Sequence, residues 1–89
     1  MHEHHKNAFE HLEDEIEDAC EYLKEADEME AQGHHYLAHG LHQIAMDEYS
    51  HANFLRDYLM RRGVYHDHEH HAEVEAHWHR LRGRLGFES

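Results

Sequence analysis

The chain has 89 residues, no proline, five glycines and a formal net charge of −12 with histidine neutral. This length suits one domain, and the acidic charge argues against nucleic acid or an anionic membrane as a partner while favouring cations. No apolar run reaches the length of a membrane span or signal-peptide core. We therefore expect a soluble, cytoplasmic protein. Its one cysteine, Cys20, excludes an internal disulfide.

The first predicted element is an amphipathic helix from about residue 8 to residue 31. Its apolar residues recur at helical spacing, and they are Phe9, Leu12, Ile16, Ala19, Leu23 and Ala26. Gly33 follows and suits the left-handed position at which many helices end.

A second helix is predicted from about residue 35 to residue 62, where Gly63 ends it. Because the loop between the two helices is short, they must form an antiparallel hairpin. The apolar residues of the second helix form one stripe: Leu37, Leu41, Ile44, Ala45, Ala52, Leu55 and Leu59. Glu48 lies near the centre of this stripe and His51 on its shoulder.

A third, weaker helix is predicted from about residue 68 to residue 82. Its apolar line is thin and consists of Val74, Trp78, Leu81 and Leu85. We therefore expect an appendage that docks on a partner rather than a core element. The predicted fold is all-α: a single domain over residues 1–89, with a core hairpin over 8–63 and a C-terminal appendage over 64–89.

Apolar residues make up 39% of the chain, which is little for a core in so small a protein. Two hairpins related by a two-fold axis would bury both apolar stripes in one four-helix bundle. The sequence therefore predicts a homodimer.

Glu48 and His51 are costly on an apolar stripe unless a metal ion compensates them. On the first helix, Glu17 and Asp18 point well away from the apolar stripe, whereas Glu15 lies about 70° from its centre. Glu15 is therefore the acid best placed to face inward. One Glu and one Glu-x-x-His pair make half the ligand set of a di-iron carboxylate bundle, and the second subunit would supply the rest. Carboxylates with one imidazole per metal suit Fe or Mn.

Two stretches match a known family: Asp14-Glu15-Ile16-Glu17 with Tyr22, and residues 47–52 (DEYSHA) followed by Leu55, Tyr58-Leu59 and Arg61-Arg62. Over about residues 10–63 the chain resembles the ferritin-like superfamily, and the encapsulated ferritins in particular. It departs from them at Glu21, where an aromatic residue often precedes the tyrosine, and its C-terminal residues 84–89 only faintly match a shell-docking tail.

This resemblance implies a homodimeric ferroxidase centre, in which Glu15, Glu48 and His51 of both subunits bind iron and Tyr22 lies beside them. It also implies that Asp14 and Glu17 form an acidic entry site for Fe(II). By the same resemblance, dimers would assemble into a ring inside an encapsulin nanocompartment. The oxidant would be dioxygen or peroxide.

Four alternatives remain open. Glu48 and His51 could be a structural polar pair that sets the register of a dimer, and Tyr22 could simply be a packing aromatic. The acidic residues of the first helix could be a solvated face. The chain could also be a non-catalytic buffer for Zn, Ni or Cu, because histidines concentrate near both termini: His2, His4, His5, His66, His68, His70, His71, His77 and His79.

Overall fold

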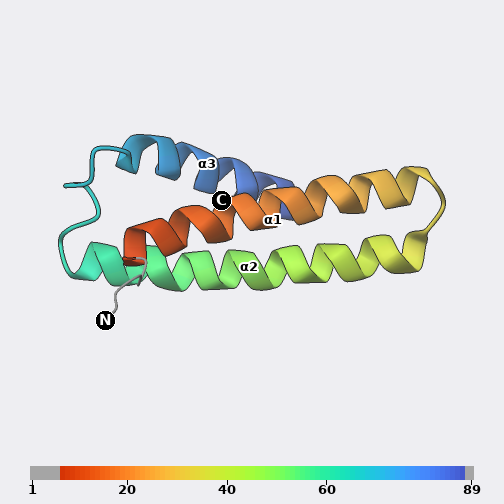
Figure 1. Ribbon diagram of the computed structural model, residues 1–89, viewed down its shortest axis with the longest axis horizontal. Helices are drawn as coiled ribbons and strands as arrows, with labels where there is room; N and C mark the ends of the chain where they lie inside the picture. The colour runs from red at the N-terminus through yellow and green to blue at the C-terminus, as the bar shows by residue number, and fades with distance from the viewer. Residues whose placement is uncertain (1–6, 88–89) are drawn as a thin grey trace.

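A computed structural model describes residues 7–87 of the chain. These residues form three α-helices: α1 (Ala8–Ala31), α2 (His35–Arg61) and α3 (His71–Leu85). The all-α prediction is confirmed for this part of the chain. Figure 1 shows α1 and α2 as a long antiparallel hairpin, with α3 lying along the N-terminal half of α1. In the described part, no helix is both long enough and apolar enough to cross a membrane.

The ends of the hairpin helices follow from local chemistry. Asn7 and Glu10 form a capping box at the start of α1, in which each side chain accepts a hydrogen bond from the other residue's backbone N–H. At the turn Gly33 adopts φ +85°, a left-handed conformation that most residues disfavour. Gly63 does the same after α2, with φ +72°.

The contact between α1 and α2 is built from large apolar residues on α1 and small ones on α2. The α1 residues include Leu12, Ile16 and Leu23, all buried. Across from them, α2 buries Ala38, Ala45 and Ala52, which are seven residues apart and therefore lie on one face of the helix. Small side chains at a contact allow two helices to approach closely.

The predicted stripe on α2 is only partly correct. Ala45, Ala52 and Leu59 are buried as expected, but Leu37 is 51% exposed and Ile44 41% exposed. Leu41 and Leu55 are half-buried. The predicted stripe spans two adjacent faces of the helix: one face packs on α1, and the other has no packing partner among the described residues.

The prediction that the third helix lies outside the core is wrong. Val74, Trp78 and Leu81 of α3 are buried in the same apolar cluster as residues of α1 and α2. This helix also begins and ends about three residues later than predicted. The segment between α2 and α3 contributes a buried residue of its own, Tyr65.

Polar contacts hold α3 on the hairpin. The Glu75 carboxylate accepts hydrogen bonds from both the Arg56 guanidinium and the Tyr65 hydroxyl, the latter at 2.6 Å. The guanidinium of Arg56 lies 3.8 Å from the centre of the Trp78 ring, and that of Arg82 lies 4.8 Å from it. Hydrogen bonding from Arg56 lowers the pKa of Glu75 to about 2, and Tyr65 contributes to this shift.

Glu75→Gln should lower the free energy of unfolding by about 2 kcal/mol at pH 7, because the ionised carboxylate is stabilised only in the folded chain. Since the folded-state pKa lies below the ordinary value, this stability is present above about pH 4.5. It is lost as the pH falls towards 2. Urea unfolding followed by Trp78 fluorescence at pH 7 and pH 3 measures both effects. The exposed Glu28→Gln is the control, and an equal loss in the two variants would contradict this role of Glu75.

Candidate metal centre

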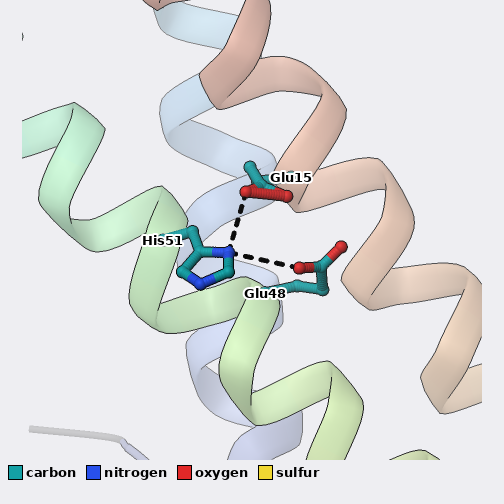
Figure 2. Close-up of side chains that lie close together, drawn as sticks. All are labelled: Glu15, Glu48 and His51. Atoms are coloured by element: carbon teal, nitrogen blue, oxygen red, sulfur yellow. Dashed lines mark hydrogen bonds and ion pairs between the residues drawn. The ribbon is translucent and has the colours of Figure 1, made fainter.

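Three potential metal ligands converge on one face of the hairpin. Glu15 extends from α1, and Glu48 and His51 extend from α2 (Figure 2). The Nδ1 atom of His51 lies 3.0 Å from Glu15 Oε2 and 3.3 Å from Glu48 Oε1. One possible ligand atom from each residue lies within 4.8 Å of the other two. Among residues 7–87, this is the one group in which three such side chains come together.

Helical spacing and the hairpin together produce this convergence. Glu48 and His51 are three residues apart, which places them on the same face of α2. The short turn at Gly33 then folds α1 back so that Glu15 lies beside them. The sequence-based choice of Glu15 as the inward acid fits this geometry, because Glu15 is partly buried whereas Glu17 and Asp18 are exposed.

The centre is less buried than predicted. Glu15 and Glu48 side chains are 22% and 19% exposed, but that of His51 is 59% exposed. The reason is visible in Figure 2, where α3 passes behind the hairpin and the three side chains lie in front of it. Within the chain, α3 covers the opposite face, so the face that bears the three side chains is open.

The two carboxylates raise the electrostatic cost of this arrangement. Partial burial raises the pKa of Glu48, and the negative charge of Glu15 and hydrogen bonding with it raise that pKa further. His51 opposes this shift, while the charge of Asp18 adds to it. Paired carboxylates with an imidazole are a donor set that suits Fe(II) or Mn(II). A cation bound among them would relieve their repulsion.

The other predicted site residues occupy different positions. Tyr22 is half-buried and packs against the apolar core. Asp14 and Glu17 line a groove between α1 and α3, together with Cys20. The structure therefore does not bring these two acids to the three-residue group, and their role as an entry site remains a prediction.

The helical spacing of α1 predicts that Asp18 points away from its apolar stripe. Its charge nevertheless lies close enough to raise the pKa of Glu48. The signal that could have identified it is its spacing from Glu15, since residues three apart on a helix are neighbours on its surface.

The C-terminal histidines contact one another and the core. The His68 ring stacks on Phe9 at 3.7 Å, and His71 Nδ1 donates a hydrogen bond to the His68 carbonyl at 2.8 Å. His66 and His71 pack edge to face. His2, His4 and His5 lie outside the described residues. In the part of the chain that can be described, the C-terminal histidines form no group of three convergent ligands.

No protein-family model, curated protein or solved structure matches the chain. Support for a function therefore comes from the arrangement of its own side chains.

Glu48→Gln should weaken Mn(II) binding on the order of tenfold or more, because it removes a charged donor from the group. Binding by the native chain should also weaken on acidification. Since the pKa of Glu48 is raised, protons compete for this carboxylate at a higher pH than for an ordinary one. Isothermal titration calorimetry with Mn(II) between pH 5 and pH 7.5 measures both effects.

Asp47→Asn is the matched control, since Asp47 is the exposed neighbour of Glu48 on α2. Equal Mn(II) affinities for the two variants would show that Glu48 is not a ligand.

Proposed function

We propose that the chain is a ferroxidase that oxidises Fe(II) to Fe(III) at a dinuclear centre shared by two copies, and that it feeds iron storage in an encapsulin compartment. The observation that supports this most is the convergence of Glu15, Glu48 and His51 on an open face of the hairpin. Di-iron carboxylate bundles take one Glu from each of two helices and Glu-x-x-His from each of the other two. One hairpin supplies half of that set.

The open face supports pairing of two copies. On α2, exposed or half-buried apolar residues flank the Glu48–His51 pair on both sides, and Leu37, Ile44 and Tyr58 are 51%, 41% and 42% exposed. Exposed apolar residues aligned along one face of a helix suit an interaction site. A second hairpin on this face would cover the apolar residues and bring the second set of ligands to the first.

Each ligand has a definable part in the reaction. Fe(II) is the substrate, and dioxygen or peroxide accepts the electron that it loses. The carboxylates of Glu15 and Glu48 hold the ion and favour oxidation, because Fe(III) carries one more positive charge than Fe(II). His51 presents Nδ1 to the same position as both carboxylates. The acidic surface of α1 attracts the incoming cations.

Assembly into a ring of dimers and location in a shell rest on the family resemblance. The C-terminal segment bears on location in a shell. The Phe87 ring stacks on Tyr49 at 5.0 Å, and Arg82 donates a hydrogen bond to the Phe87 carbonyl. A shell that binds this tail would have to displace these contacts.

Glu48→Ala should slow oxygen-dependent Fe(II) oxidation by at least about tenfold, because it removes a ligand. Glu17→Ala should retain most of the activity, since Glu17 lies on the groove with α3. Zn(II) should occupy the centre and inhibit oxidation. The assay follows Fe(III) absorbance under air. Equal rates for the two variants would contradict the proposal.

Binding of Zn, Ni or Cu that survives Glu48→Ala, but is lost when His66, His70 and His77 are replaced, would instead favour the buffering function. Substitution is a better test than deletion of residues 66–89, because α3 is part of the core.

Ile44→Glu should produce a monomer at micromolar concentration, because it places a charge in the middle of the apolar part of the open face. Sedimentation equilibrium distinguishes monomer from dimer. Asn53→Glu is the control, since Asn53 is also exposed but points away from this face. A native chain that sediments as a compact monomer would refute the dimer.

A further inference from the structure

The open face of the hairpin consists of two lines of residues, one on each helix. Successive members of each line are alternately three and four residues apart, as in the contact seam of a coiled coil. The α2 seam consists of Leu37, Leu41, Ile44, Glu48, His51, Leu55 and Tyr58. The α1 seam consists of Ala8, His11, Glu15, Asp18, Tyr22, Glu25 and Met29. The contact between Glu15 and His51 shows that both seams face the same side.

The two seams differ in chemistry. The α2 seam is apolar except at Glu48 and His51. The α1 seam is polar along its middle, and His11, Asp18 and Glu25 are all exposed.

Two arrangements with two-fold symmetry could cover this face. An axis parallel to the helices would place the α1 seam of one copy on the α2 seam of the other, so that Asp18 and Glu25 would be buried against leucine and isoleucine. An axis across the helices would place each helix antiparallel to its own counterpart. Apolar residues would then meet apolar residues, and polar residues would meet polar ones. Burial of unpaired charge against apolar surface is strongly unfavourable, so the seams favour the second arrangement.

We infer that two copies pair about a two-fold axis that crosses the helices at the level of Glu15, and that His11 of one copy pairs with Asp18 of the other on each side of the metal centre. This inference rests on the proposed dimer and specifies its geometry.

The register on α2 is consistent with this axis. Each α2 helix runs antiparallel to its counterpart, so the residue numbers of any two positions that face each other across the axis add to the same constant. Glu48 meets the partner's His51, Ile44 meets the partner's Leu55, and Leu41 meets the partner's Tyr58. Each of these pairs is complementary in charge or in apolar character.

The register on α1 is complementary as well. Reversal of α1 about Glu15 makes the numbers of facing positions add to 30, so Asp18 lies level with the partner's position 12, one residue or about 1.5 Å along the helix from the partner's His11. An acid and a base are therefore within reach of each other. The same reversal brings the large Tyr22 next to the partner's Ala8, and both of these residues are half-buried in the single chain. At the axis, Glu15 meets the partner's Glu15, and the two half-sites join into one group of four carboxylates and two imidazoles.

The proposed pair of His11 with the partner's Asp18 can be tested by exchanging the two charges. Asp18→Lys should raise the dimer dissociation constant roughly threefold to tenfold, because it places two cationic side chains together in two symmetric pairs. His11→Glu should do the same by placing two acids together. The double variant should restore dimerisation towards that of the native chain. Sedimentation equilibrium at low salt and pH 6, where an ordinary imidazole is mostly protonated, measures these constants, and Glu21→Lys controls for the change in net charge.

Engineered cysteines test the direction of the axis. In a Cys20→Ser background, Ile44→Cys with Leu55→Cys should form disulfide-linked dimers on oxidation. These positions are eleven residues, or about 16 Å, apart on one helix and cannot be linked within a chain. If the axis instead runs along the helices, a mixture of Ile44→Cys and Tyr22→Cys chains should cross-link to each other.

The two kinds of failure can be told apart. Cross-linking in that mixture, or a double charge variant that dimerises no better than the single variants, would overturn the proposed axis and pairing while leaving the dimer intact. A native chain that is monomeric with and without Mn(II) would overturn the dimer itself.

Discussion

Close packing of α1 on the alanine face of α2 is the constraint on which the rest of the structure depends. Ala38, Ala45 and Ala52 recur every seven residues and have almost no exposed surface. Because their side chains are short, α1 approaches closely enough for Glu15 to reach within 3.0 Å of His51. The same choice of residues leaves the bulky Leu37 and Ile44 exposed on the adjacent face, where none of residues 7–87 covers them fully. The group of three potential ligands and the open seam therefore have a common origin.

The two faces of the hairpin are covered in different ways. On one face α3 completes the core with Trp78 and Leu81, and it is fixed there by the contact of Arg56 with Glu75. On the other face the three potential ligands lie in the open, with His51 more than half exposed. In the proposed dimer, the second copy would therefore occupy the face that α3 leaves uncovered. This asymmetry favours a closed pair of hairpins over an open stack.

The sequence predicts some of this architecture accurately, and the errors have physical causes. The bounds of α1 and the inward placement of Glu15 follow from a single apolar periodicity, and the turn follows from the glycine at position 33. The orientation of α2 is less predictable, because its apolar residues span two adjacent faces, only one of which packs on α1, and on the sequence they form a single broad stripe. The packing of α3 is obscured by its charged residues: Arg56 and Glu75 read as surface residues, but their mutual contact and the stacking of Arg56 on Trp78 join them to the core. Contacts between residues far apart in the chain leave no periodic signal.

A purely structural role for Glu48 and His51 fits the electrostatics less well than metal binding does. A polar pair that sets register is most stable when each charge is matched, but here two carboxylates face one imidazole and the pKa of Glu48 is raised. Pairing two copies would bring four carboxylates to two imidazoles, so the excess of negative charge would grow as the apolar seams are buried. Two divalent cations would reverse that repulsion. In the proposed arrangement, metal binding and association would stabilise each other, because ions held by ligands from both copies would bind more tightly to the pair than to the single chain.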